Sequence, residues 1–93
     1  MGQPIWDGIV MSTAYVLISC RLGKEEEIID ELKNILCVKE IHGTFGAYDI
    51  VAKVVSDSAD VLRETITWQI RKLPDIISTI TVMGIKGQEF KRD

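Results

Sequence analysis

The 93-residue sequence predicts a single α+β domain with the element order strand, helix, strand, strand, helix, strand. Three observations support this prediction. Runs rich in β-branched residues alternate with two segments whose apolar residues recur at helical spacing. A turn centred on Gly46 separates the two middle runs. Gly23 precedes the first helical segment, and Pro74 follows the second.

The first strand is expected over residues 14–20, which are dense in β-formers, and the first helix over residues 24–36. Glutamates at 25–27 fall in the first turn of that helix, where carboxylates favour the positive end of the helix dipole. This acidic run is therefore interpreted as a solvated helix start. The residues predicted on the buried side of the helix are Ile28, Leu32, Ile35 and Leu36.

The centre of the chain, residues 38–55, predicts two strands joined by a short turn. Gly46 is the expected pivot because glycine adopts positive φ without steric cost. A second helix is expected over residues 59–73, with Asp57 or Ser58 as its N-cap. Its predicted apolar stripe consists of Ala59, Leu62, Ile66, Ile70 and Leu73.

Trp68 falls on the opposite face of the second helix, where it is interpreted either as an edge-of-core residue or as an oligomer contact. Residues 76–85 predict the last strand. Right-handed crossovers between these elements give a ferredoxin-like βαββαβ fold, with an antiparallel sheet of order 4-1-3-2 and two helices on one face. Both faces of the two central strands are apolar, so a second subunit is expected on the face without helices, as in dimeric α/β-barrel proteins.

Charge and cysteine content exclude several classes of function. A net charge of −3 with scattered basic residues argues against direct DNA binding, and no apolar run is long enough for a membrane span. Cys20 and Cys37 are expected to be free thiols in a reducing cytoplasm. His42 is the only histidine and is interpreted as a surface residue, so neither a metal site within one chain nor a cofactor is expected. Metal binding at the surface or between subunits stays open.

The predicted topology brings three segments to one end of the sheet: residues 21–23, 44–47 and 77–79. Side chains there suit a small zwitterion, because they combine one carboxylate with hydroxyl groups. The alternative is that Asp49 is a turn residue that bonds nearby amides, and that the threonines are ordinary strand residues. The candidate side chains are Tyr48, Asp49, Ser78, Thr79 and Thr81.

Residues 38–41 and the Thr-Phe-Gly-Ala-Tyr-Asp-Ile run at 44–50 resemble the effector-binding domain of the Lrp/AsnC family, also called the RAM domain. The last strand, residues 76–82, resembles the fourth strand of that family, and the resemblance covers residues 13–86. It implies a subunit that dimerises through its sheet and forms rings of dimers, with amino-acid effectors bound between neighbouring dimers. It further implies an effector site made of Thr44, Gly46, Tyr48 and Asp49, with Ser78 and Thr79 from the fourth strand.

Two departures from the family pattern stand out. Cys37 occupies a turn position where the family often has glycine. Residues 1–12 are too few for the helix-turn-helix domain of full-length members and are expected to be a lead-in or an added extension. A stand-alone effector domain is therefore expected over residues 13–86, followed by a polar tail at 87–93.

The predicted function is non-enzymatic: a cytoplasmic domain that senses a small effector such as an amino acid and modulates transcription through full-length Lrp/AsnC regulators. Two alternatives stay open. One is a small monooxygenase or isomerase of the dimeric ferredoxin-like barrel type, which needs a pocket lined by His or paired carboxylates. The other is a metal-binding assembly module without an organic ligand.

Overall fold

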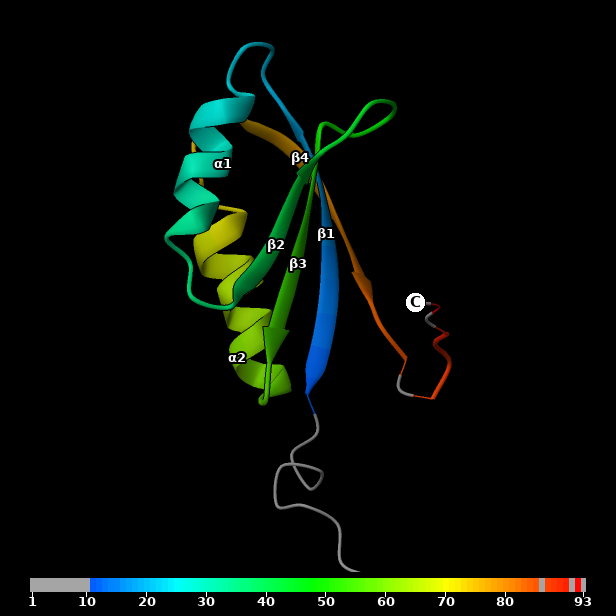
Figure 1. Cartoon of the computed structure of the whole chain (residues 1–93). Coiled ribbons are helices and arrows are strands. Elements are labelled where there is room, and N and C mark those ends of the chain that lie inside the picture. The colour runs from blue at the N-terminus through cyan, green and yellow to red at the C-terminus, as the bar shows by residue number, and fades with distance from the viewer. Residues whose placement is uncertain (1–10, 86, 91, 93) are drawn as a thin grey trace, which may run out of the picture.

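Four antiparallel strands form one sheet in the order β2-β3-β1-β4, which is the predicted order 4-1-3-2 listed from the other edge (Figure 1). The computed structural model describes residues 11–85, 87–90 and 92. The predicted lead-in up to residue 10, position 86 at the end of the predicted domain, and positions 91 and 93 of the predicted tail lie outside the described residues. The strands are β1 (Ser12–Cys20), β2 (Val38–Gly43), β3 (Ile50–Ser56) and β4 (Ile76–Met83).

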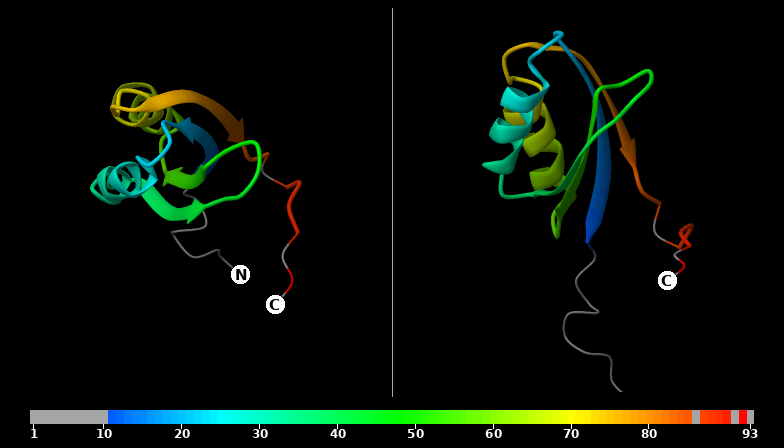
Figure 2. Two further views of the ribbon diagram at one scale, coloured as in Figure 1. Left: turned by 90° about the horizontal axis from the view of Figure 1, so that it is seen from above. Right: turned by 45° about the horizontal axis from the view of Figure 1, so that its top comes forward.

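Two helical segments cover one face of this sheet, as Figure 2 shows from two further directions. The first, α1 (Glu25–Lys33), is shorter than predicted. Its backbone tightens into turns after Lys33, where the amide of Ile35 donates to the carbonyl of Leu32 at 3.0 Å. These turns bring Ile35 into the core but leave Leu36 87% exposed. The prediction that Leu36 is buried was therefore wrong, because the helical period on which it depended ends before that residue.

The second helical segment begins as α2 (Ala59–Glu64) and continues as a π-helix, η2 (Thr65–Ile70). Ser58 is its N-cap, since the hydroxyl of Ser58 accepts from the amide of Val61 at 3.2 Å. Ala59 is exposed, which corrects its predicted place in the apolar stripe, because burial in α2 begins one turn later, at Leu62. Trp68 is 64% exposed, so it is not an edge-of-core residue.

The core lies between the helices and the sheet and is built from alternate residues of the two central strands. On β1 and β3 every second side chain is buried, and the cross-strand pairs Val16 with Ala52 and Ile18 with Ile50 join them. From the helices, Ile28, Leu32, Leu62, Ile66 and Ile70 pack onto this layer as predicted. Cys20 is buried at the end of the layer, and both cysteines are free thiols.

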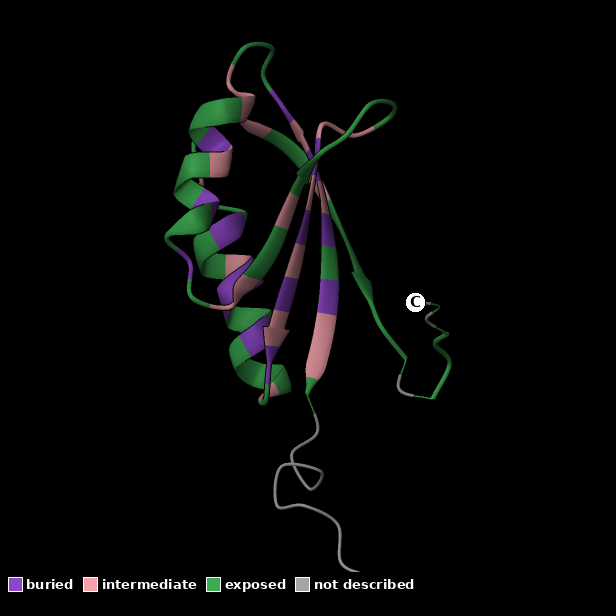
Figure 3. Ribbon diagram, in the orientation of Figure 1, coloured by how far each residue is buried: buried purple, intermediate pink, exposed green. Residues whose placement is uncertain are grey.

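The opposite face of the sheet carries no helix and stays apolar. Tyr15 on β1 pairs with Val82 on β4, and Leu17 pairs with Ile80. Tyr15 on the central strand β1 is 40% exposed, and Ile80 and Val82 on the edge strand β4 are 47% and 48% exposed, so this face presents a row of exposed apolar side chains. Figure 3 shows that β4 is exposed along most of its length. No helix in the described part of the chain is long and apolar enough to cross a membrane.

Candidate functional site

The candidate site lies at the end of the sheet where three connections meet (Figure 1): the β1–α1 loop, the β2–β3 hairpin loop and the turn that leads into β4. The first and third connections are joined by a hydrogen bond and an ion pair. The amide of Arg21 donates to the carbonyl of Asp75 at 2.9 Å, and the two side chains form an ion pair at 3.5 Å. Asp75 has a positive φ of 70°, which is uncommon for a non-glycine residue, so this pairing holds a strained backbone in place.

The hairpin loop closes on itself through Thr44. Its amide donates to the carbonyl of Asp49 at 2.8 Å, and its hydroxyl donates to the carbonyl of Tyr48 at 2.7 Å. Gly46 has a φ of 146°, so the sequence-based expectation of a positive φ there is confirmed. Phe45 is fully exposed at the tip of the loop. The backbone of this loop is thus fixed at its base, while its tip faces solvent.

Asp49 forms hydrogen bonds between the hairpin loop and β1. It lies just beyond Ile18 and Ile50, the last residues that pair between β1 and β3. Its amide donates to the carbonyl of Ile18 at 2.9 Å, and its carboxylate oxygen Oδ2 accepts from the amide of Cys20 at 2.9 Å. The carboxylate therefore replaces a strand carbonyl at the point where the sheet pairing stops. This differs from the alternative of a turn residue that bonds nearby amides, because the Cys20 amide lies 29 positions away on β1. A contact between Asp49 and a ligand stays a prediction.

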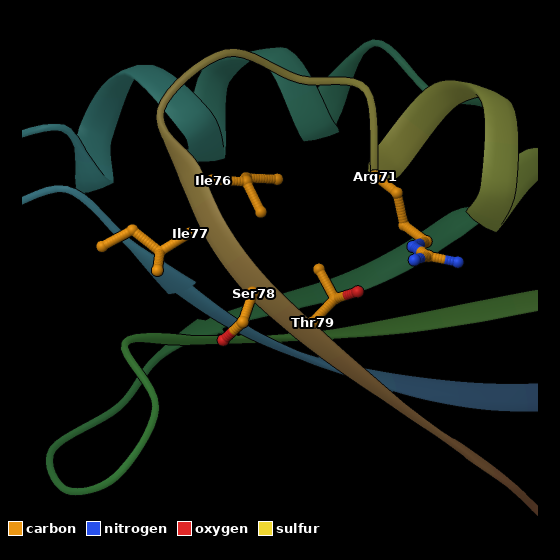
Figure 4. A pocket seen from close by; sticks show the side chains of 5 residues that line it. All are labelled: Arg71, Ile76, Ile77, Ser78 and Thr79. Carbon is orange, nitrogen blue, oxygen red and sulfur yellow. The ribbon is translucent and has the colours of Figure 1, made fainter.

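The two β4 candidates, Ser78 and Thr79, line a surface hollow of about 320 Å³ (Figure 4). Strand alternation sends them to opposite faces. Ser78 pairs with Ser19 on the face without helices, whereas Thr79 pairs with Ile18 on the helix face. The remaining lining residues are Arg71, Ile76 and Ile77.

Arg71 is the lining residue that sequence reasoning missed. It directly follows η2, and its amide closes the last π-type turn by donating to the carbonyl of Ile66 at 2.9 Å. In the sequence it is one of eleven scattered basic residues, so no local pattern marks it. The available signal was its place between the second helix and the last strand. The chain must return from that helix to the start of β4, so a residue at the end of the helix lies near the first residues of the strand.

Thr81, also named as a candidate, lies further along β4, where it pairs with Val16 and is exposed. It does not line the hollow. The structure thus divides the predicted site into two parts at one end of the sheet. One part is the self-bonded hairpin with Thr44, Gly46, Tyr48 and Asp49, and the other is the hollow with Ser78 and Thr79.

Two ionisable groups near these elements have shifted pKa values. Burial, together with the nearby carboxylate of Asp49, raises the pKa of the Cys20 thiol. On the open sheet face, the hydrogen bond with His42 and the contact with Lys53 lower the pKa of the Glu40 carboxyl. The Nε2 atom of His42 lies 3.3 Å from Oε1 of Glu40, and His42 is exposed.

Among the described residues, no group of three or more His, Cys, Asp or Glu side chains is placed to hold a metal ion.

Comparison with known proteins gives a consistent assignment. Residues 13–89 match the family model described as the Lrp/AsnC ligand binding domain. The crystal structure of FFRP-DM1 is 38% identical, with a TM-score of 0.76, over 80% of this chain and 99% of that one. A search of curated proteins found no match.

Two more distant solved structures show the same fold. The structure of E. coli AsnC is 19% identical with a TM-score of 0.82, and the likeness covers all of this chain and 63% of that one. The regulator NMB0573 from Neisseria meningitidis, solved as an L-Met complex, is 11% identical with a TM-score of 0.75. That likeness covers 97% of this chain and 59% of the regulator.

Proposed function

Because the chain belongs to the Lrp/AsnC ligand-binding domain family, we propose that it senses a small effector such as an amino acid and passes this signal to DNA-binding regulators of the same family. The observation that carries the proposal is the family match over residues 13–89. The geometry supports a location for the effector, because the hairpin loop and the hollow lie at the same end of the sheet. The proposed contacts are Thr44, Gly46, Tyr48, Asp49, Ser78 and Thr79.

An amino acid is the proposed effector class for two reasons. The distant relative NMB0573 has been solved with L-Met. In this chain, the volume of about 320 Å³ lies at the small end of the range for ligand pockets, about 300–1,000 Å³, which suits a metabolite. No histidine and no carboxylate line this hollow, so its lining supports binding rather than acid–base chemistry.

The proposed assembly is a dimer through the open sheet face, extended into a ring of dimers with effectors between subunits. The support is the row of exposed apolar side chains that Tyr15, Ile80 and Val82 form on that face. Covering such a patch contributes a hydrophobic term of about 25 cal/mol per Å² of apolar surface removed from water, and the entropic cost of association opposes this term.

A thermal-shift screen of the twenty amino acids and common divalent metals tests the ligand. A compound that binds only the folded state raises the melting temperature, and the rise grows with the logarithm of the ratio of its concentration to its dissociation constant. We expect at least one amino acid to raise it, with no response to metals. A response to metals alone would instead favour a metal-binding assembly module.

Light scattering tests the assembly. We expect a dimer or a larger even-numbered species at micromolar concentration, and a smaller species for Val82→Asp, which places a charge on the open face. Thr81→Asp is the matched control, because its register with Val16 places it on the other face of the same strand. A parent protein that is monomeric at this concentration would refute the proposed dimer.

A further inference from the structure

We infer that Arg71 and Thr79 form the carboxylate-binding part of the effector site, so that the effector is a small molecule with a free carboxylate next to an apolar group. This inference rests on the proposed function, which leaves the group that recognises the carboxylate unassigned. Arg71 comes from the end of η2 and Thr79 from β4, and both line the hollow in Figure 4.

The charge of Arg71 is available to a ligand. Within the described residues, the ion pairs at this end of the sheet join Arg21 to Asp75 and Lys24 to Glu27, and none includes Arg71. The carboxylate of Asp75, four positions along the chain, is held by Arg21. Arg71 is exposed, and a guanidinium presents a fork of donors that matches the two oxygens of a carboxylate.

The two hydroxyl side chains of the hollow are not equivalent. Thr79 lies on the helix face of β4, the side from which Arg71 approaches, and Figure 4 shows its hydroxyl turned toward the guanidinium. The hydroxyl of Ser78 points to the other side of the strand. A carboxylate bound by Arg71 therefore finds its second donor in Thr79.

The remaining walls define the other end of the ligand. Ile76 is half-buried and Ile77 is exposed, and both belong to the first residues of β4. They offer apolar contact to an aliphatic group a few bonds from the carboxylate. Two unusual backbone features border the hollow: the π-helix that ends at Ile70 and the positive φ of Asp75. Such features are costly and concentrate at functional sites.

The experiment uses the full chain and three kinds of probe: L-Leu and L-Met, their C-terminal amides, and isovalerate. Isovalerate keeps the carboxylate and the aliphatic group but lacks the amine. Calorimetry measures the amino acids, and ligand-observed NMR detects the weaker binding of isovalerate. We expect each amino acid to bind roughly ten- to a hundredfold more tightly than its amide, the range that follows from one charge-assisted hydrogen bond.

The variants are Arg71→Gln and Thr79→Val, with Arg63→Gln as the matched control. Arg63 is exposed like Arg71, but it lies within α2 and its guanidinium pairs with Asp60 at 2.8 Å. We expect Arg71→Gln to remove the preference for the carboxylate and to abolish isovalerate binding, and Thr79→Val to weaken both. Arg63→Gln should bind like the parent protein. Circular dichroism and light scattering verify that each variant keeps its fold and assembly.

The outcomes separate this inference from the proposed function. If Arg71→Gln binds amino acids as tightly as the parent protein, the inference fails while the sensing function stands. If isovalerate binds in an Arg71-dependent manner but no amino acid binds, the carboxylate site stands and the amino-acid effector is refuted. If neither probe binds the parent protein, the carboxylate site is refuted, and the sensing function is refuted with it when no amino acid of the thermal-shift screen raises the melting temperature.

Discussion

Replacement of Asp49 by alanine should destabilise the fold through one hydrogen bond that the sequence alone does not reveal. In the structure, the Asp49 carboxylate accepts from the amide of Cys20 at 2.9 Å, where the pairing of β1 with β3 ends. A hydrogen bond to a charged group contributes about 1.5–3 kcal/mol, and its loss leaves a backbone donor without its acceptor. We expect Asp49→Ala to lower the free energy of unfolding by about 1.5–3 kcal/mol. Asp49→Asn keeps a neutral acceptor and should lose about half of that.

Urea unfolding at a fixed protomer concentration measures these losses, because the stability of an oligomer depends on concentration. Asp60→Ala is the control: Asp60 is exposed and pairs with Arg63 on the helix surface, so its loss should cost less than about 0.5 kcal/mol. Hydrogen exchange at the Cys20 amide reports the bond directly and should accelerate in Asp49→Ala. An alanine variant as stable as the Asp60 control, with Cys20 still protected, would refute the structural role of Asp49.

Three further predictions address the core, the hairpin and the buried thiol. Leu32 is fully buried, so Leu32→Ala should cost about 2–5 kcal/mol in urea unfolding, whereas the exposed Leu36→Ala should change it by less than about 0.5 kcal/mol. Gly46→Ala meets no atom within 4 Å, so its cost of about 1–3 kcal/mol should come from the positive φ alone, and a loss no larger than that of Gly43→Ala would contradict this. Because the pKa of Cys20 is raised in the folded protein, the protonated thiol contributes to the free energy of unfolding. This contribution is fully present below the unfolded-state pKa of 9.0 and is lost as the pH rises above it. Cys20→Ala should show a smaller loss of stability between pH 8 and 10 than the parent protein, and equal losses would exclude a contribution from this thiol.

The fold was predictable because the hydrophobic pattern determines it. The helical spacing of Leu32, Leu62 and Ile66 identified the buried face of each helix, whereas the alternation on β1 and β3 separated two apolar faces without showing which one the helices cover. The errors lie at helix ends, at Leu36 and Ala59, where turn geometry rather than periodicity decides burial.

The candidate site was less predictable because its parts meet only after folding. Arg71 and Thr79 belong to different elements, and nothing in the local sequence links them. The π-helix that ends next to Arg71 has no clear sequence signature, whereas the start of a helix is marked by its cap residue and its end by a proline. Asp49 was identified as a candidate, but the amide that its carboxylate binds lies 29 positions away.

The edge position of β4 makes this strand a possible site of aggregation. Ile76–Met83 contains no charged residue and no proline, and within the described chain it pairs with a strand on one side only. Charged side chains and prolines are the usual gatekeepers that prevent a free strand edge from recruiting another chain. The free edge of β4 therefore presents a segment prone to amyloid-like strand addition. Strand addition at this edge, rather than low intrinsic stability, is then the expected cause of inclusion bodies when this protein is overproduced.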